Sequence, residues 1–513
     1  MGYTAEDMRR VTPRASASRP GDEAQAMRDS LRRLALAETM AGHAPRQAYS
    51  PIVLSGLVRI VEFAIIMATG FAVFEIYIGP SLPLAYLVVL PVVALAALLI
   101  FQALGLNNTA AYRDPVHSGF RIAGGWTIVL LVALALVFFM RFEIVFSRVW
   151  FLAWYVSGLA ALIGERIVLA LIVRRMTASG RLDRRTVIVG GGPAGEAVLR
   201  ELSQQKHTDL RICGVFDDRT DERSPDVVAG YPRLGTVDDL VEFARHTRID
   251  LVIFTLPITA EDRLLQMLRK LWVLPIDIRL AAHTNKLRFR PRSYSWIGNV
   301  PVLDVFDKPI TDWNVVIKTV FDKAIGSLLL LLFSPLMLLI ALAVKLDSRG
   351  PVFFRQLRHG FNNEEVWVLK FRSMYVDQLD HLAARQVTRG DPRVTRVGRF
   401  IRKTSLDELP QLFNVVFSGT LSLVGPRPHA VHAHAAERRY DEVVDGYFAR
   451  HRVRPGITGW AQIHGWRGET DTPEKIQKRV ECDLFYIENW SILLDLYILA
   501  MTPFALMKTE NAY

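Results

Sequence analysis

Two adjacent carboxylates, Asp407 and Glu408, are the side chains of this sequence best suited to chemistry, and they lie in the run Ser405–Pro410. Ser-x-x-Glu beside a proline is also a helix capping box, which explains Glu408 better than Asp407. In the first turn of a helix, a carboxylate is held ionised by the helix dipole. An ionised aspartate near arginines is suited to attack phosphorus or to bind Mg²⁺.

Basic side chains are concentrated just before this acidic pair. Residues 355–403 contain eleven Lys and Arg against five Asp and Glu. This stretch is suited to line an anion site or to contact anionic lipid headgroups, and it also fits a solvated helix face. Nucleic acid is not expected, because the sequence contains no recognisable binding module for it. Within the stretch, arginine recurs at every third position at Arg393, Arg396, Arg399 and Arg402.

Two stiff loops follow the acidic pair, Gly425–Pro428 and Arg454–Trp460. Each presents arginine between prolines or glycines, which suits phosphate binding but also an ordinary turn. Three histidines, at positions 429, 432 and 434, raise the possibility of a metal site. No carboxylate pattern accompanies them, so metal binding there is disfavoured. The two cysteines of the chain, Cys213 and Cys482, form neither a disulfide framework nor a zinc site.

A second candidate site has the pattern G-x-G-x-x-G at Gly190, Gly192 and Gly195. It follows a short apolar strand and precedes a predicted helix, which is the context of a dinucleotide-binding loop. Asp217, at the end of the next predicted strand, is placed to bind a ribose hydroxyl. Such a fold also persists as a scaffold without a ligand, so both interpretations stay open. Neither Tyr231 nor Tyr294 has the following lysine of short-chain redox enzymes.

The elements around these glycines alternate between strands and helices. This order predicts a Rossmann-like α/β domain with a parallel sheet over residues 186–300. The predicted strands are Val187–Val189, Leu210–Phe216, Leu251–Phe254 and Ile276–Leu280, and the predicted helices are Ala194–Gln205, Val237–His246 and Glu261–Trp272.

The composition of the chain points to a membrane. It has 513 residues, 51% of them hydrophobic, and a positive mean hydropathy of +0.21. Residues 48–175 contain four apolar runs of membrane-spanning length. Arginines before the first run and after the fourth place both ends in the cytoplasm. Residues 1–47 carry no long apolar run and are expected to form a mobile cytoplasmic tail. The four runs are Val58–Ile78, Leu84–Leu106, Ile122–Met140 and Val149–Val173.

A fifth apolar run, Ala324–Val344, has Ser334-Pro335 at its centre and basic residues at both ends. Proline removes one helical hydrogen bond, and a neighbouring serine can bind the group that is freed. The run therefore fits a re-entrant helix over residues 324–345 that enters and leaves on one side, and it fits equally a kinked helix that crosses. A last apolar segment, Leu493–Met507, is short and is expected to pack or lie at the interface.

Residues 315–513 resemble the bacterial sugar transferases that move hexose 1-phosphate onto polyprenyl phosphate, which are phosphoglycosyl transferases with a monotopic catalytic core. The preceding spans and α/β domain resemble the long form of that family. Residues 429–470 are most similar to the undecaprenyl-phosphate glucose phosphotransferases. The matching stretches are Ser334-Pro335, Lys370–Met374, Thr404–Leu412, Ser422–Pro428, Arg454–Gln462 and Arg467–Thr470.

The resemblance implies a catalytic domain over residues 312–513, mainly α-helical, with the re-entrant helix, on the cytoplasmic face of the bacterial inner membrane. Asp407 would attack the β-phosphorus of a UDP-sugar, release UMP and pass the sugar phosphate to undecaprenyl phosphate. Glu408 would position Mg²⁺ together with Asp407. The expected phosphate-binding side chains are Arg402, Arg427, Lys370 and Arg372.

The reaction implied by the resemblance is the first membrane step of exopolysaccharide synthesis, with UDP-glucose as the expected UDP-sugar and membrane lipids as partners. A homo-oligomer is possible, and nucleic acid is not expected. Two other functions stay open at this point. One is a membrane-tethered nucleotide-sugar dehydratase or epimerase that uses the glycine-rich domain. The other is a non-catalytic scaffold for polysaccharide assembly.

Overall fold

The computed structural model describes residues 49–507, apart from short internal stretches. The tail, residues 1–47, lies outside the described residues, and so do His432 and Arg467–Thr470. The stretches left out are 80–82, 140–145, 205–208, 220–224, 257–260, 283–294, 298–299, 379–390, 430–433, 436–437, 440–446 and 467–471.

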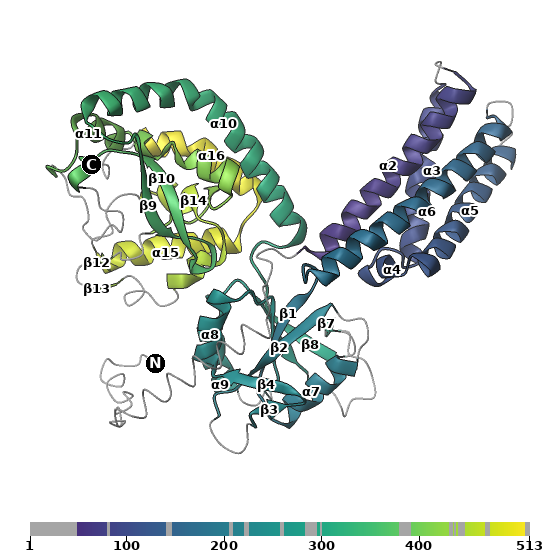
Figure 1. The fold of residues 1–513 in the computed structure, drawn as a ribbon, viewed down its shortest axis with the longest axis horizontal. Helices are drawn as coiled ribbons and strands as arrows, with labels where there is room; N and C mark the ends of the chain where they lie inside the picture. Colours follow the sequence, from purple (N-terminus) through teal and green to yellow (C-terminus); the bar gives the residue numbers. More distant parts are fainter. Residues whose placement is uncertain are drawn as a thin grey trace, which may run out of the picture.

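Four long apolar helices pack side by side at one end of the molecule (Figure 1). Each is long and apolar enough to cross a bilayer, as is α10 of the C-terminal domain, and the chain is a membrane protein. The third helix begins earlier than expected and continues through Gly124-Gly125 without a break. The four are α2 (Pro51–Tyr77), α3 (Leu84–Ala103), α5 (Pro115–Phe139) and α6 (Arg148–Ala178), and the short α4 (Thr109–Arg113) precedes α5.

Tryptophans fill the centre of this helix group. The indole nitrogens of Trp150 and Trp154 donate to the carbonyls of Gly70 and Ile66, each at 3.1 Å. A Cβ atom on Gly70 would lie 2.7 Å from the Trp154 ring, so only glycine permits this approach of α2 and α6. The buried charges Glu62 and Arg166 form an ion pair between the same two helices, which keeps both charges away from the lipid.

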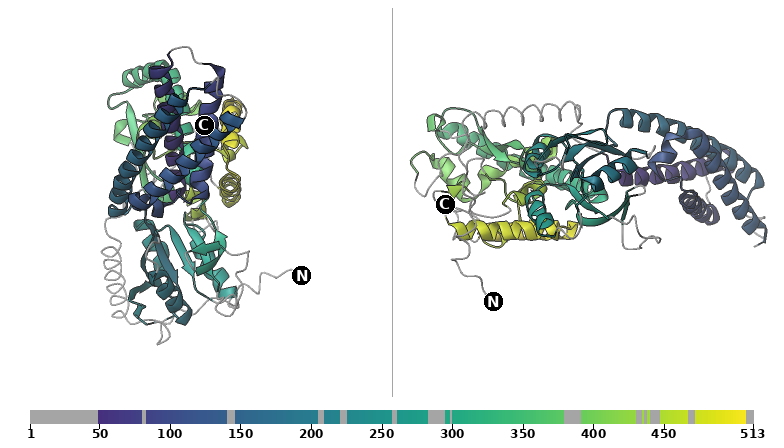
Figure 2. Two further views of the ribbon diagram at one scale, coloured as in Figure 1. Left: turned by 90° about the vertical axis from the view of Figure 1, so that its right-hand side faces the viewer. Right: turned by 90° about the horizontal axis from the view of Figure 1, so that it is seen from below.

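The α/β domain lies at one end of the helix group (Figure 2). Its sheet has the strand order β3-β4-β2-β1-β5-β6-β8-β7. The central strands β1, β2, β5 and β6 are parallel, whereas β7 and β8 add an antiparallel edge that extends the domain beyond the expected limit at residue 300. The strands are β1 (Arg184–Val189), β2 (Leu210–Phe216), β3 (Val227–Val228), β4 (Tyr231–Gly235), β5 (Leu251–Phe254), β6 (Asp277–Ala281), β7 (Ser295–Ile297) and β8 (Val300–Phe306).

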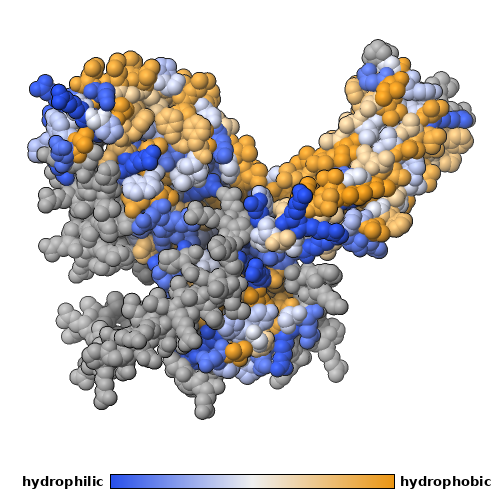
Figure 3. All heavy atoms as spheres, viewed as in Figure 1, coloured by the Kyte–Doolittle hydropathy of each residue, from blue (hydrophilic) through white to orange (hydrophobic). Residues whose placement is uncertain are grey.

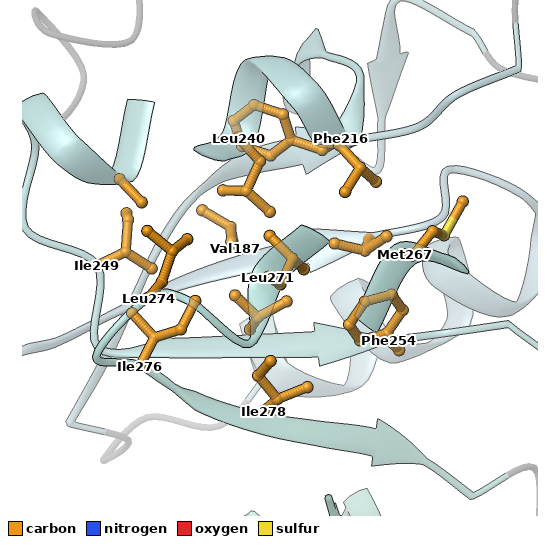
Figure 4. Packing of buried hydrophobic residues seen from close by; sticks show 14 of the residues in the cluster. Val187, Phe216, Leu240, Ile249, Phe254, Met267, Leu271, Leu274, Ile276 and Ile278 are labelled. Carbon is orange, nitrogen blue, oxygen red and sulfur yellow. The ribbon is translucent and has the colours of Figure 1, made fainter. Parts of the chain in front are cut away.

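Helices cover both faces of this sheet, as parallel strands require. Helices α8 (Val237–His246) and α9 (Glu261–Leu271) cover one face, and α7 (Pro193–Gln204) covers the other. Figure 4 shows the first of these cores, where Leu240 and Leu271 pack onto the strand residue Val187. The alternation seen in the sequence therefore predicted the parallel central strands of this α/β domain, but not its antiparallel edge.

The C-terminal domain contains helices and three small two-stranded sheets, so the expectation of a mainly α-helical core is incomplete. Strands β9 and β10 form an antiparallel pair, whereas β11 and β14 are parallel although they lie far apart in sequence. Its elements are α10 (Asp312–Asp347), β9 (Phe353–His359), η2 (Phe361–Asn363), β10 (Glu365–Phe371), η3 (Val376–Gln378), α11 (Arg396–Lys403), η4 (Leu406–Glu408), α12 (Gln411–Phe413), η5 (Asn414–Ser418), β11 (Ser422–Val424), β12 (His434–Ala435), β13 (Arg438–Arg439), η6 (Tyr447–Arg452), β14 (Gly456–Thr458), α14 (Trp460–Ile463), α15 (Pro473–Glu488) and α16 (Ile492–Met507).

Helix α10 is one curved helix of 36 residues that arches over the rest of the domain (Figure 1). Pro335 leaves the carbonyl of Leu331 without its helical donor. The hydroxyl of Ser334 donates to that same carbonyl at 2.8 Å, as the sequence predicted. The domain packs against both halves of the helix. Gly326, in the first half, lies beside Val415, and Met337, in the second half, packs in one cluster with Phe371. The outer face of α10 is apolar and exposed (Figure 3).

Candidate active site

The acidic pair lies in η4, a single 3₁₀ turn directly after α11. The predicted capping box is wrong, because Ser405 has a left-handed backbone with φ 57° and makes no capping hydrogen bond. A non-glycine residue with positive φ is strained, and such strain is typical of sites whose surroundings fix the backbone.

Glu408 is held by two cations. Lys370 Nζ of β10 lies 3.0 Å from Glu408 Oε1, and Arg427 Nη2, in the turn after β11, lies 2.5 Å from the same oxygen. Burial by itself would raise the pKa of Glu408, but Arg427 and Lys370 together hold it well below its usual range. Glu408 is therefore a fixed anion at neutral pH.

Asp407 differs from its neighbour. Its side chain is buried, with 8% exposed, and it forms no ion pair with any of the described residues. Burial raises the pKa of Asp407, and the charge of Glu408 raises it further, against the opposing charges of Lys370 and Arg402. No cation of the described residues binds its oxygens, which are therefore available to an incoming electrophile.

A small pocket adjoins Glu408, and its charged lining residues are Arg358, Lys370, Arg427 and Glu408 itself, whereas Asp407 is the next residue in sequence and does not line it. Three cations against one anion favour a phosphate group. The sequence predicted Lys370 and Arg427 but missed Arg358 and also Gln411, which lines the same pocket. Arg358 lies in the basic stretch of residues 355–403, so a weak signal for it was present.

Arg427 is positioned by the two stiff loops, which the structure brings together as one unit. Gly425 N donates to Thr458 O, and Gly456 N donates to Pro426 O, each at 2.9 Å. A Cβ atom on Gly456 would lie 2.1 Å from Gly425 N. The glycines are thus needed for the close approach of two backbones, which fixes the turn that carries Arg427.

A buried polar network supports this turn from behind. Arg450 Nη2 donates to the carbonyl of Arg427 at 2.7 Å and lies 2.6 Å from Asp483 Oδ2, with both side chains fully buried. His429 Nδ1 lies 2.7 Å from the Tyr447 hydroxyl. Burial and the charge of Arg450 lower the pKa of His429 well below its usual value, so its imidazole is neutral. Sequence reasoning missed Arg450 and Asp483 because nothing in their local sequence marks them.

His429 belongs to this network through its contacts with Tyr447 and Arg450. Within the described part of the chain, no group of three or more His, Cys, Asp or Glu side chains is arranged to hold a metal ion. His432 lies outside the described residues, and the structure does not describe the side chain of His434.

Of the other predicted phosphate-binding residues, Arg402 is near the site and Arg372 is not part of it. Arg402, in the last turn of α11, is close enough for its charge to lower the pKa of Asp407. Arg372 is buried and donates to the carbonyls of Ser348 and Arg349, each at 2.7 Å. Its guanidinium therefore holds the C-terminal end of α10, and its predicted role is corrected accordingly.

Comparison with known proteins agrees with this geometry. Residues 313–509 match the bacterial sugar transferase family, and residues 102–282 match a family described as a CoA-binding domain. The chain is 38% identical over 427 residues to the UDP-glucose:undecaprenyl-phosphate glucose-1-phosphate transferase of Klebsiella pneumoniae, an alignment that covers 82% of this chain and 89% of that protein. The chain belongs to the bacterial sugar transferases.

Two further relatives of this sugar transferase carry the same name. The protein of Xanthomonas campestris pv. campestris is 33% identical over 462 residues, which is 89% of this chain and 94% of that one. The protein of Escherichia coli K12 is 37% identical over 437 residues, which is 84% and 91% of the two chains. The similarity thus extends through the membrane helices and the α/β domain, and is not confined to the acidic pair and its surroundings.

The glycine-rich site of this sugar transferase is assembled where it was predicted, after β1. Its polar groups bind one another, however. Gly191 N donates to Asp217 Oδ2 at 2.8 Å, and Thr255 Oγ1 donates to Gly190 O at 2.9 Å. Asp217 is buried, and its other oxygen accepts from the backbone of Arg219. The carboxylate predicted to bind ribose is therefore already engaged within the protein.

Steric contacts give a second reason for the last glycine of the motif. A Cβ atom on Gly195 would lie 2.1 Å from Gly190 O, so close packing of α7 on β1 requires glycine there. In open α/β sheets, ligands bind where the strand order reverses, which here is between β1 and β5. Thr255, directly after β5, donates a hydrogen bond to Gly190 O across the gap between these two strands, so its side chain occupies the place where a ligand would bind.

Proposed function

We propose that this chain transfers glucose 1-phosphate from UDP-glucose to undecaprenyl phosphate through a covalent intermediate on Asp407. The observation that carries the proposal is the buried carboxylate of Asp407, free of ion pairs within the described residues and next in sequence to Glu408, which lines a pocket together with three cations. The substrates are those named for relatives that align with more than four fifths of the chain.

In the first step an oxygen of Asp407 attacks the β-phosphorus of UDP-glucose. A bond forms between that oxygen and phosphorus, and the bond from the β-phosphorus to the bridging oxygen breaks. The bridging oxygen keeps the electron pair, so UMP leaves as an anion. Glucose 1-phosphate remains on Asp407 as an acyl phosphate. Arg427, Lys370 and Arg358 offset the charge of the phosphates.

In the second step a phosphate oxygen of undecaprenyl phosphate attacks the same phosphorus. The bond between the carboxyl oxygen of Asp407 and phosphorus breaks, and the carboxylate is restored. The product is undecaprenyl diphosphate glucose, which we propose is the first lipid-linked intermediate of an exopolysaccharide. Two in-line displacements at one phosphorus need a nucleophile that is also a good leaving group, and a carboxylate satisfies both requirements.

The donor set around Asp407 also fits Mg²⁺. This ion usually binds one or two protein carboxylates and completes its shell with water and substrate phosphates. Lys370 and Arg427 both bind Oε1 of Glu408. Among the described residues no cation binds Oε2 of Glu408, so this oxygen is available to a metal ion. Asp407 and Glu408 would hold Mg²⁺, which when bound neutralises part of the phosphate charge.

We further propose that α10 is re-entrant, with the catalytic domain on the cytoplasmic face of the inner membrane. The domain packs against the first half of α10 through Gly326 and against its second half through Met337 and Val344. A helix that crossed the bilayer completely would carry its second half away from a domain on one side. Cysteines introduced at Thr311 and Asp347, in a background without Cys213 and Cys482, should both resist an impermeant thiol reagent in spheroplasts and react after lysis. Labelling of only one site before lysis would contradict re-entry.

The central experiment incubates the full-length protein in nanodiscs with UDP-glucose, Mg²⁺ and undecaprenyl phosphate. We expect UMP and a glucose-containing lipid diphosphate in equal amounts. UDP-galactose in a parallel reaction tests the choice of sugar. Without the lipid acceptor, intact-mass spectrometry should show one hexose phosphate on the wild-type chain and none on Asp407→Asn. A lipid product formed without any protein adduct would overturn the covalent route.

A further inference from the structure

A cavity of about 380 Å³ lies where the membrane helices meet the catalytic domain. Its walls come from the first turns of α2, the turn between α3 and α4, and the first turn of α10. They include Arg59, Asn107 and Trp313. None of its lining residues lines the pocket beside Glu408, so this is a separate site.

Several polar atoms at this cavity are buried without a hydrogen-bond partner. They are both side-chain atoms of the Asn107 amide, Nδ2 and Oδ1, and the Nε of Arg59. Neighbouring polar groups are satisfied, since Ser55 Oγ donates to the carbonyl of Asn107 and Thr109 Oγ1 donates to Asp209. Buried polar groups are nearly always paired in folded proteins. The unpaired atoms of Asn107 and Arg59 belong to residues that line the same cavity, which indicates that a ligand binds there.

The chemistry of the lining favours an oxyanion. The guanidinium of Arg59 forms no ion pair with any of the described residues. The nearest acidic residue along α2, Glu62, is already paired with Arg166. A guanidinium and an amide N–H together match the oxygens of a phosphate group, which a cationic ligand does not offer.

The position of the cavity adds a second requirement, that the ligand be a lipid. The cavity lies at the ends of apolar helices, where arginines flank the membrane segments. Exposed apolar side chains lie on both helices beside it, Ile52 and Ile60 on α2 and Ile317 on α10. These surfaces are suited to acyl chains. Trp313 packs on Gly56, where a Cβ atom would lie 2.4 Å from the indole ring.

We propose that this cavity binds the phosphate group of a membrane lipid, with Arg59 and Asn107 as its ligands. The cavity lies between the start of α2 and the start of α10. These two helix starts are also linked by a hydrogen bond of 2.5 Å from Ser50 Oγ to Asp312 Oδ1. A lipid bound there contacts both the helix group and the start of α10, and so strengthens the junction between them.

Native mass spectrometry of the delipidated full-length protein tests this site. The protein is titrated with dioleoyl phosphatidylglycerol, with dioleoylglycerol, which has the same chains without phosphate, and with inorganic phosphate. We expect one tight phosphatidylglycerol site that Arg59→Gln weakens about tenfold, the usual effect of losing a charge-assisted hydrogen bond. Arg174→Gln is the matched control, because Arg174 is an exposed arginine of α6 that does not line the cavity.

The outcomes separate the sources of the phosphate. Displacement by undecaprenyl phosphate at concentrations below that of phosphatidylglycerol would assign the site to the carrier lipid, and the reverse would assign it to a phospholipid. Equal binding to Arg59→Gln, equal binding of dioleoylglycerol, or equally tight binding of inorganic phosphate would overturn the proposal. If Arg59→Gln fails to fold, Asn107→Leu removes the amide at similar size and should also weaken binding. Unchanged binding to a folded Asn107→Leu would then reject the site.

Discussion

The glycine-rich end of the α/β domain and the acidic pair of the transferase domain were both conspicuous in the sequence, and the structure completes them in opposite ways. At the first, the carboxylate of Asp217 accepts a backbone N–H of the glycine loop, and Thr255 closes the loop from the other side. At the second, Glu408 takes up two cations and leaves Asp407 without a cation among the described residues. A motif therefore indicates a backbone shape, whereas a reactive site also needs a polar group that the fold has not already satisfied.

The strongest test of this contrast replaces one carboxylate in each region. Asp407→Asn should lower the transfer rate by roughly 10⁴-fold or more, because the amide cannot form the acyl phosphate. Asp217→Asn should leave the rate of the folded protein within about twofold, since its amide oxygen can still accept from Gly191 although the hydrogen bond from Arg219 is lost. Both rates are measured as UMP release. A loss of more than about tenfold in Asp217→Asn would show that the α/β domain takes part in catalysis.

The cation that holds Glu408 should give the next largest effect. Arg427→Gln removes one fixed charge aimed at the phosphates and should lower kcat/KM by about 10²–10³. Arg427 lowers the pKa of both Glu408 and Asp407, so without it both pKa values rise and activity should fall off at a higher pH as the solution is acidified than it does in the wild type. The pH–rate profile measures this displacement. An unchanged acidic limb would mean that Arg427 does not set the charge of either carboxylate.

The supporting network should affect stability more than chemistry. Asp483→Asn leaves Arg450 buried without its anion and should lower the free energy of unfolding by about 3 kcal/mol. Because Arg450 also binds the carbonyl of Arg427, kcat should fall by about tenfold. Thermal unfolding and steady-state kinetics in nanodiscs measure the two effects separately. Arg200→Gln is the control, since its ion pair with Glu196 is exposed and contributes little.

The smallest effect on transfer is expected from the glycines of the α/β domain. Gly195→Ala places a Cβ atom 2.1 Å from Gly190 O and should destabilise the domain by about 1–3 kcal/mol. At Gly192 the nearest atom, Arg219 Nη1, would lie 3.5 Å away, so Gly192→Ala should be tolerated. Both folded variants should keep transfer within about twofold of the wild type. In calorimetry with NAD and with coenzyme A, we expect no heat of binding to the wild type. A saturable signal would show that the glycine-rich end of the sheet binds a nucleotide after all.

Part of the site could be predicted because its signals are local in sequence. The acidic pair, Lys370 and Arg427 lie in short stretches whose residue types already point to phosphate chemistry, and the structure brings both cations onto Glu408. Arg372 lies two residues after Lys370 and looked equivalent, yet it binds carbonyl groups at the end of α10. Alternate residues of a strand point to opposite faces only when the strand is regular, and β10 ends at residue 371, before Arg372. The sequence does not show that the strand ends between Lys370 and Arg372, so it does not show that their side chains point to different surroundings.

What the sequence determined by itself were the features that depend on near neighbours. Five apolar helices, the alternation of the α/β domain and the serine that binds the carbonyl freed by Pro335 all follow from composition, periodicity and spacing over a few residues. Tertiary structure alone decided which polar groups are satisfied. It paired Asp483 with Arg450 and brought Gly425 against Gly456. It also placed the carboxylate of Asp217 to accept from the glycine loop, and left Asp407 without an ion pair among the described residues. The physical reason is that hydrogen bonds and charge pairs depend on distances of a few ångström between residues far apart in the chain, and only packing sets those distances.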